Sequence, residues 1–324
     1  MICLKIMKFD KLNFKWFLKN LYYRFKYYNL LKGEKHATLD NTIVFFVGEK
    51  TVYPGLADII KSIVGSYYIA KFNSLDFKVV FDKPFVLLKF LQPNVHNWHI
   101  KDSQIEKSWL NTQLINYQGV GELPELNKSK QIHIRNYRGI NLLQRNNLPN
   151  WKIQWHHLFN ELFKPSQALM LELDNLGLNR NSFVSIHVRF VNTLEVLEQS
   201  CLSWSKPLDK IARERLLKRI FNIVNDISNK ECKTIYIFSD SELFLKEAKN
   251  KGYNILPGKV GHVGYNGKDE IVMKAFVDWF AMSFSDKIYR IKGKPLYESA
   301  FPLYSSLIGN KEYMEISLND DNIS

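Results

Sequence analysis

The second half of the sequence alternates short, β-rich apolar runs with helical patterns. The runs are SFVSIHVRF (182–190), KTIYIFSD (233–240), YNIL (253–256) and DKIYRI (286–291). Strands that alternate with helices along a chain form a mostly parallel sheet with helices on both of its faces. This half therefore predicts an α/β fold.

The helices between these runs have clear end signals. One helical pattern runs from residue 207 to about 228, with Ser205 as the expected N-cap. Asp240 or Ser241 is expected to cap the next helix, and Gly252 closes it because glycine readily adopts a left-handed turn. These end signals agree with the strand pattern.

The first half predicts a second α/β unit. NTIVFFVG (41–48) is typical of a buried strand, residues 56–70 carry apolar side chains at helical spacing, and LDFKVVFD (75–82) follows as another strand. Residues 93–155 show weak periodicity, which fits either substrate-facing loops or the surface of a large domain. Because chains well beyond about 250 residues usually split, this length predicts two domains.

The composition restricts partners and compartment. A formal net charge of +13 favours polyanions, which include nucleic acid, anionic lipid and nucleotide-activated sugars. Cys3, Cys201 and Cys232 lie far apart without zinc spacing, which indicates a reducing compartment. The sequence has no apolar run of about 20 residues and no signal-peptide pattern at its start, so we expect a cytoplasmic protein.

Residues 8–32 form a basic, aromatic segment in which Lys and Arg alternate with Trp, Phe and Tyr. At helical spacing this is the composition of an interfacial helix. Peripheral binding to an anionic membrane surface is one interpretation. A helix packed on the body of the protein, with its lysines in water, is the alternative.

Polar side chains follow two of the predicted strands, where ligands bind in open parallel sheets. They are His187, Arg189, Asn192 and Glu195 after one strand, and Ser239, Asp240 and Ser241 after another. Arg189 suits a bidentate grip on phosphate, with a structural ion pair as the alternative. His187 points to the same side of the strand, either as a ligand contact or as a packed, hydrogen-bonded histidine. Asp240 has helix capping as its alternative role.

These residues also carry a resemblance to a known family. SIHVRFVN (185–192) resembles the H-x-R-x-G-D motif of the GDP-fucose-dependent fucosyltransferase superfamily, which includes bacterial α-1,2-fucosyltransferases, α-1,6-fucosyltransferases and protein O-fucosyltransferases. Residues 235–253 are similar to its second strand motif, which ends in Ser or Thr followed by Asp, and residues 275–308 are similar to its C-terminal motifs. The stretch Pro54-Gly55-Leu56-Ala57-Asp58 is similar to its Gly-rich motif G-L-G-N-R. The resemblance covers roughly residues 42–98 and 182–316.

The resemblance implies a GT-B-like fold, with two Rossmann-like domains whose mostly parallel sheets face a cleft. We expect a basic aromatic segment at 1–40, an acceptor-side α/β domain at 41–165, a nucleotide-sugar-binding domain at 166–316 and a polar tail at 317–324. By the same match, Arg189 would contact the donor's β-phosphate, Asp278 would contact the guanine, and Ser299 with Phe301 would line the pyrophosphate and the base. The remaining donor-site residues are Gly55, His187 and Asp240.

The chain departs from the family pattern at two places. Val191-Asn192 replaces the Gly-Asp that follows the arginine, and Asp58-Ile59 replaces the Asn-Arg of the first motif. The donor could therefore be another sugar nucleotide, or lysines could supply the missing phosphate contacts. The candidate lysines are Lys61, Lys259 and Lys294.

The expected activity is transfer of fucose from GDP-fucose to a hydroxyl of a saccharide or lipid-linked saccharide acceptor, in cell-surface polysaccharide or lipopolysaccharide synthesis. The resemblance implies no cofactor and no required metal. Glu195 is the candidate base for the acceptor hydroxyl, with Asp58 second. The alternatives are a different nucleotide sugar, a catalytically inactive relative that binds sugar nucleotides or glycans, and a basic nucleic-acid-binding protein, although no recognised nucleic-acid motif is present.

Overall fold

The computed structural model describes residues 18, 21, 22, 25, 40–46, 55–117, 125–136, 142–145, 148–196, 206–266 and 268–318. The chain divides into two compact units, and each is described by itself. The first consists of Met1–Phe46, Ser66–Val80 and Trp98–Tyr137, and the second of Val47–Gly65, Phe81–Asn97 and Arg138–Ser324. The chain therefore passes between the units several times.

The basic aromatic segment at 8–32 lies almost wholly outside the described residues. Four of its side chains are described, and all four are helical and exposed: Leu18, Leu21, Tyr22 and Phe25. None of the described helices is long and apolar enough to cross a membrane.

The first unit contains a parallel four-stranded sheet in the order β2-β1-β5-β4. Its strands are β1 (Thr42–Phe46), β2 (Asp76–Val80), β4 (Thr112–Tyr117) and β5 (Gln131–Asn136), and the 3-10 turns η2 (Asp102–Gln104) and η3 (Trp109–Asn111) precede β4. Helix α2 (Leu56–Phe72) connects β1 to β2 and belongs to the second unit as far as Gly65. The predicted strands at 41–48 and 75–82 and the predicted helix at 56–70 are confirmed.

Strands β4 and β5 lie in the stretch where the sequence gave no regular pattern. The reason is that buried polar side chains interrupt their apolar alternation. Gln131 and His133 have no exposed surface. The Gln131 side-chain oxygen accepts hydrogen bonds from the backbone N–H of Glu106 at 2.8 Å and from His133 Nε2 at 2.7 Å. These contacts fix the segment before β4 against β5.

The second unit contains a parallel five-stranded sheet in the order β11-β10-β7-β8-β9. Its strands are β7 (Phe183–Val188), β8 (Thr234–Ser239), β9 (Asn254–Ile255), β10 (Lys287–Lys292) and β11 (Glu312–Ser317). The first four confirm the predicted strands, whereas β11 has no counterpart among the predictions. The chain extends the sheet from β7 through β8 to β9 and then crosses to β10 and β11 on the other side of β7. The topological switch point therefore lies beside β7, where open α/β sheets bind ligands.

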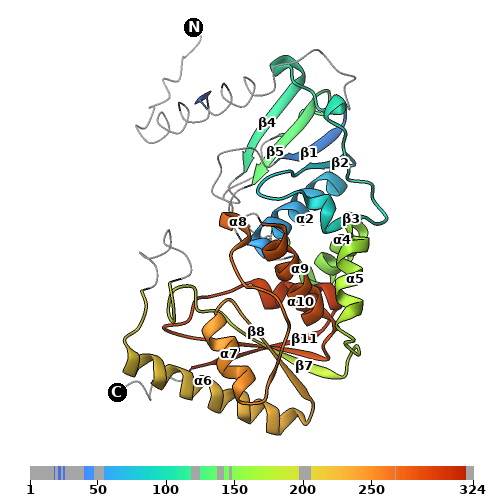
Figure 1. The fold of residues 1–324 in the computed structure, drawn as a ribbon. Helices are drawn as coiled ribbons and strands as arrows, with labels where there is room; N and C mark the ends of the chain where they lie inside the picture. The colour runs from blue at the N-terminus through green and yellow to red at the C-terminus, as the bar shows by residue number, and fades with distance from the viewer. Residues whose placement is uncertain are drawn as a thin grey trace. The chain divides into compact units, whose positions relative to one another are not determined.

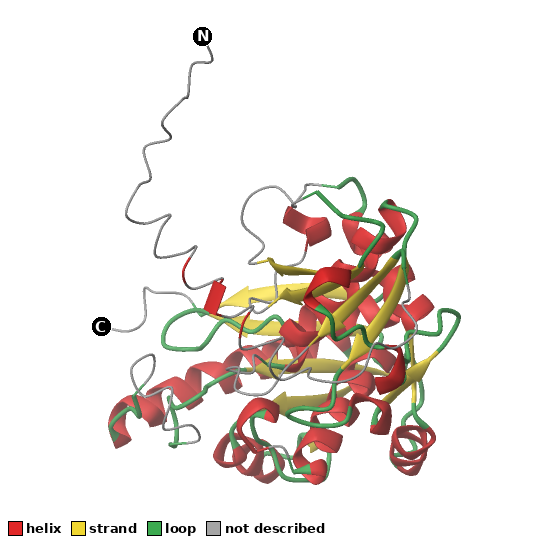
Figure 2. Cartoon of the chain, turned by 90° about the horizontal axis from the view of Figure 1, so that it is seen from above, coloured by secondary structure: helices red, strands yellow, loops and turns green. Residues whose placement is uncertain are grey.

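Helices cover both faces of this second sheet (Figures 1 and 2). Val184, Ile186 and Val188 of β7 pack in one core with side chains of α6 (Lys210–Glu231) and α7 (Glu242–Asn250). On the other face lie α9 (Asp269–Phe284) and α10 (Phe301–Gly309), which pack against each other. The remaining elements of this unit are η1 (Leu87–Lys89), β3 (Leu91–Pro93), α3 (Leu142–Arg145), α4 (Trp151–Leu162), β6 (Phe163–Pro165), α5 (Gln167–Asn175) and α8 (Val263–Asn266).

The helix ends partly differ from the predictions. Helix α6 begins at Lys210, later than the predicted residue 207, because the carboxylate of Asp209 caps it and accepts the Ala212 N–H at 2.8 Å. Ser205, the expected cap, lies outside the described residues. Ser241 caps α7 through the Phe244 N–H, which leaves Asp240 for another role.

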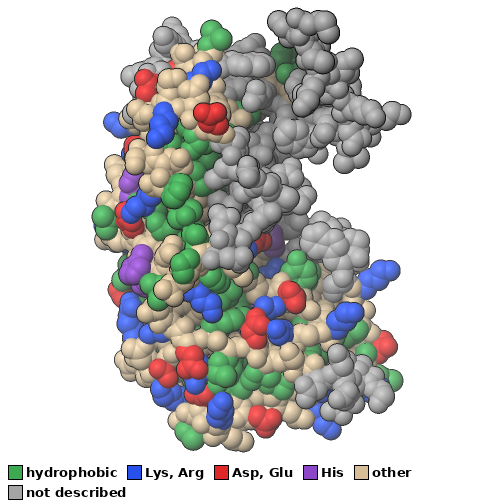
Figure 3. Space-filling view, turned by 180° about the vertical axis from the view of Figure 1, so that it is seen from behind, with side chains coloured by type: hydrophobic (Ala, Val, Ile, Leu, Met, Phe, Trp, Pro, Cys, Tyr) green, Lys and Arg blue, Asp and Glu red, His purple; other side chains and the backbone are tan. Residues whose placement is uncertain are grey.

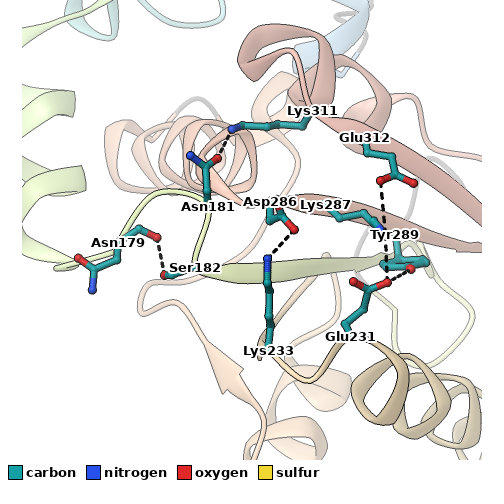
Figure 4. Close-up of polar contacts among 10 residues, drawn as sticks. All are labelled: Asn179, Asn181, Ser182, Glu231, Lys233, Asp286, Lys287, Tyr289, Lys311 and Glu312. Atoms are coloured by element: carbon teal, nitrogen blue, oxygen red, sulfur yellow. Dashed lines mark hydrogen bonds and ion pairs between the residues drawn. The ribbon is translucent and has the colours of Figure 1, made fainter.

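Ion pairs and hydrogen bonds link the elements at the amino ends of the strands (Figure 4). Glu231, the last residue of α6, accepts hydrogen bonds from the Tyr289 hydroxyl and from Lys287. Lys233 pairs with Asp286 at 2.7 Å, just before β8 and β10 begin. These contacts tie α6 to β10 at the edge opposite to the one where β7 and β8 end.

Candidate functional site

A pocket opens in the second unit where β7 and β8 end. Its lining residues come from six segments of this unit: Gly55, Leu56, His187, Arg189, Phe238, Ser239, Asp240, Val260, Gly261, His262, Val263, Ile271, Lys274, Ala275, Asp278 and Phe301. Six of the eight residues predicted for the site from sequence are among them, including residues as distant in sequence as Gly55 and Phe301. Ser299 and Glu195 are not among the lining residues.

Arg189 and Asp240 face each other at the ends of two neighbouring strands. Val188 of β7 is in register with Ser239 of β8, so the next residue of each strand reaches the same edge. Arg189 Nε lies 3.5 Å from Asp240 Oδ2, and the Arg189 side chain keeps 23% of its surface exposed. The guanidinium is thus held on one side and accessible to a ligand on the other.

The carboxylate of Asp240 also holds the turn after β7. It accepts the backbone N–H groups of Phe190 and Val191, each at 2.8 Å. Val191 has φ +56°, a left-handed conformation that is strongly disfavoured for a β-branched residue. This is the position of the glycine in the family motif, and glycine adopts such a φ readily. Asp240 therefore stabilises a strained turn that carries Arg189, and it does not cap α7.

We expect Asp240→Asn to lower the free energy of unfolding by about 2–3 kcal/mol, because an amide oxygen replaces two charge-assisted acceptors and leaves a backbone N–H unpaired. Denaturant unfolding at pH 7 measures the change. Asp226→Asn, on the exposed surface of α6, is the matched control and should change stability little. A loss below about 0.5 kcal/mol for Asp240→Asn would contradict the role of this carboxylate.

His187 is a neutral, buried histidine in the pocket wall. Burial, helped by the positive charges of Arg189 and Arg290, lowers the pKa of His187 from 6.5 to about 3. Its Nδ1 atom is buried and has no hydrogen-bond partner among the described residues. Buried polar atoms in folded proteins are almost always paired, so an unpaired one in a pocket wall points to a ligand.

His262 is a pocket residue that the sequence predictions did not include. The Gly264 N–H donates to His262 Nδ1 at 3.1 Å, which leaves the ring proton on Nε2, beside Gly55. Burial and the charge of Arg189 lower the pKa of His262 to about 4, so the ring is neutral near pH 7. Gly55 immediately precedes α2, whose amino-terminal dipole favours anions. Arg189, His262 and the start of α2 make this part of the pocket suited to phosphate oxygens.

Two phenylalanines line the pocket, and one of them, Phe301, is the first residue of α10. Trp279 Nε1 donates to the Phe301 carbonyl at 3.0 Å, and the two rings are stacked at an interplanar angle of 28° with centroids 6.0 Å apart. Ser299 accepts the Phe301 N–H through its hydroxyl at 3.3 Å, so it supports the start of α10. These contacts hold the Phe301 ring at the pocket wall.

The two candidate bases have partners elsewhere. Glu195 accepts hydrogen bonds from the Ser241 hydroxyl at 2.8 Å and from the Leu243 N–H at 3.1 Å, at the start of α7. Asp58 pairs with Lys61 at 2.5 Å in the first turns of α2. Neither carboxylate lines the pocket, nor do the three lysines suggested for phosphate binding: Lys61, Lys259 and Lys294.

Two of the residues that line the pocket form an ion pair on α9. Lys274 and Asp278 are one helical turn apart and almost fully buried, with Lys274 Nζ 2.5 Å from Asp278 Oδ1. Burial raises the pKa of the Asp278 carboxyl above its usual range, and Lys274 opposes that shift. Asp278 was predicted for the site, whereas Lys274 was missed, although two charges four residues apart on a helix otherwise apolar in this stretch are a readable signal.

Within the described part of the chain, no group of three or more His, Cys, Asp and Glu side chains lies close enough to hold a metal ion.

Comparisons with known proteins add information on the fold. No family model matches the sequence, and neither does any curated protein. Among solved structures, NodZ α-1,6-fucosyltransferase co-crystallized with GDP is 12% identical over 85% of this chain and 93% of that chain, with a TM-score of 0.50. The structure of fucosyltransferase NodZ from Bradyrhizobium is 12% identical over 85% of this chain and 94% of that chain, with a TM-score of 0.50. NodZ soaked with GDP-fucose is 12% identical over 85% of this chain and 93% of that chain, with a TM-score of 0.49. At this identity the likeness extends to the fold alone, and the chain has an α/β, GT-B-like fold with mostly parallel sheets.

Proposed function

We propose that this chain is a glycosyltransferase that moves fucose from GDP-fucose to a hydroxyl of a saccharide acceptor. The observation that carries the proposal is the pocket at the switch point of the second sheet. It unites Arg189, His187, Asp240, Asp278, Phe301 and Gly55, the residues that the resemblance assigns to the donor. The fold shared with NodZ, which was co-crystallized with GDP, supports the same class of donor.

The pocket suggests how the donor would lie. Arg189, the Nε2–H of His262 and the amino end of α2 would hold the diphosphate, since all three favour negative charge. Phe301 offers an apolar ring to the base, and the buried carboxylate of Asp278 offers an acceptor for its N–H groups. Asp240 would act by holding the turn that carries Arg189.

In the proposed reaction, the bond between the fucose C1 atom and the β-phosphate oxygen breaks, and its electron pair stays on the diphosphate. The acceptor hydroxyl oxygen forms the new bond to C1, and its proton passes to solvent water. Positive groups fixed around the leaving diphosphate stabilise the charge that develops there, and this kind of preorganised electrostatics is a large contribution to catalysis. The proposal needs no metal ion, and full activity in the presence of EDTA would be its expected signature.

The described residues on the face drawn in Figure 3 give no specific support for the nucleic-acid alternative. On the face drawn in Figure 3, the Lys and Arg side chains of the described residues are interspersed with Asp and Glu. A nucleic-acid site usually gathers basic side chains into a stripe or patch. The net charge of +13 is therefore compatible with a pocket for a nucleotide sugar.

Calorimetric titration with GDP, UDP, CDP and GDP-fucose tests the proposal. We expect GDP and GDP-fucose to bind in the micromolar range and at least about 10-fold more tightly than UDP or CDP, because Asp278 has two N–H donors to accept from guanine. Tighter binding of UDP or CDP would reassign the donor, and binding of none of them would refute the proposal. Turnover with a saccharide acceptor then separates an enzyme from an inactive relative.

A further inference from the structure

The Lys274–Asp278 pair does more than neutralise a buried carboxylate. Lys274 Nζ donates to Asp278 Oδ1 at 2.5 Å and contacts the Leu256 carbonyl at 3.3 Å, at the end of β9. An ammonium group has three N–H donors, so one has no partner among the described residues. Both side chains line the pocket.

The loop after β9 is shaped around this lysine. Gly258 has φ +103°, and a Cβ atom there would lie 3.0 Å from Lys274 Cδ. Any other residue at this position would strain the backbone and press its Cβ atom against the lysine stem. The stem is thus packed on one side by the loop, and the ammonium group is held in place by Asp278 and Leu256. A buried charge kept so firmly at a pocket wall can recognise a ligand without further loss of side-chain freedom.

We propose that Lys274 completes the base contact already proposed for Asp278: while Asp278 accepts from a ring N–H, Lys274 donates to the adjoining ring carbonyl, so that the nucleotide base is selected by the order of its acceptor and donor. The inference rests on the proposed function, because it concerns the base of the same donor. Guanine presents its O6 carbonyl next to N1–H, with the exocyclic amino group as a second donor. Adenine and cytosine present an amino donor next to a ring acceptor, which is the reverse order.

Because the order is reversed in adenine and cytosine, the Lys274–Asp278 pair would disfavour these bases as well as bind guanine. With adenine, the Lys274 N–H would face an amino group and the Asp278 carboxylate would face a ring nitrogen lone pair. A site whose buried polar groups are left unpaired by the wrong ligand discriminates strongly. We expect GDP to bind at least about 100-fold more tightly than ADP, with Lys274 and Asp278 each responsible for a part.

The test compares GDP with 6-thioguanosine diphosphate, in which sulfur, a weaker acceptor, replaces only O6. The wild-type protein is expected to prefer GDP by about 10-fold or more, and Lys274→Met is expected to bind the two within about 2-fold. Asp278→Asn should weaken both ligands but keep the preference, because O6 still faces Lys274. Lys246→Met, on the exposed surface of α7, removes the same charge away from the pocket and should behave as wild type.

The outcomes separate this inference from the proposed function. If the wild-type protein binds GDP and its 6-thio analogue equally, Lys274 does not read the base, and this result requires no variant to fold. A Lys274→Met protein that still prefers GDP would overturn the inference and leave the guanine-nucleotide donor intact. Failure of the wild-type protein to bind any of these nucleotides would refute the proposed function itself.

Discussion

Replacing Arg189 by alanine is expected to weaken the binding of GDP by about 30- to 1,000-fold, which corresponds to about 2–4 kcal/mol. Among the described residues that line the pocket, Arg189 is the one arginine, and Asp240 pairs with its guanidinium. Its removal would take away a bidentate partner of the phosphate oxygens and leave His262 and the start of α2 to hold the diphosphate. Isothermal titration calorimetry with GDP measures the loss.

Two further variants make this result specific. Arg189→Lys keeps the charge but lacks the planar fork, so its affinity should lie between those of the wild type and the alanine variant. Arg215→Ala, on the exposed surface of α6, should leave GDP binding unchanged. Removing Arg189 should also raise the pKa of His262, because the arginine charge helps to lower it. GDP affinity that survives Arg189→Ala would exclude this residue from the phosphate site.

Acid is expected to destabilise the protein between pH 6.5 and about 3 through two buried, neutral histidines. Burial lowers the pKa of both His133 and His187 from 6.5 to about 3. In this window the unfolded state takes up the protons and the folded state does not, so stability is complete above pH 6.5 and falls as the pH decreases. Each histidine contributes a slope of about 1.4 kcal/mol per pH unit over most of this window.

The histidine of the first unit, His133, provides the cleaner experiment, because it is not among the residues that line the pocket. His133→Gln keeps an N–H donor for Gln131 and cannot take up a proton. As the pH decreases, the free energy of unfolding of this variant should therefore fall less steeply than that of the wild type, and the two slopes should differ by about 1.4 kcal/mol per pH unit. The control is His99→Gln, an exposed histidine of the same unit. Urea unfolding from pH 7.5 to 4 measures the slopes. Parallel slopes for wild type and His133→Gln would show that His133 does not control acid stability.

Much of the second sheet could be predicted from sequence, because its strands are short apolar runs between amphipathic helices. Strands β4 and β5 could not be predicted in the same way. Strand β5 buries Gln131 and His133: the Gln131 side chain is hydrogen-bonded to the backbone of the distant Gln104 and Glu106, and His133 is hydrogen-bonded to Gln131. Strand β11 has half-exposed side chains and two glutamates, so its sequence lacks the apolar run that marks a buried strand.

The candidate site was predictable where a residue directly follows a strand. Arg189 and Asp240 meet this condition, His187 lies within the last two residues of β7, and the ends of β7 and β8 bring the three together. Glu195 follows the same strand, but its carboxylate is bound to the start of α7. Whether a polar residue beyond a strand faces the pocket or a neighbouring helix depends on the path of the loop, which local patterns do not encode. His262 and Lys274 line the pocket because of the tertiary arrangement of the chain, which local sequence patterns do not show.

The way the chain passes between the two units has a consequence for biosynthesis. Gly55 and Leu56 line a pocket whose other walls are built from residues 187 to 301. Helix α4, with Trp155 packed against Tyr304, likewise comes much earlier in the chain than its partner α10. A ribosome must therefore release nearly the whole polypeptide before the pocket can close, and a fragment that starts at residue 166 would lack part of its wall. In a nascent chain, the segment around Gly55 would therefore lack the residues it packs against in the pocket until translation is almost complete.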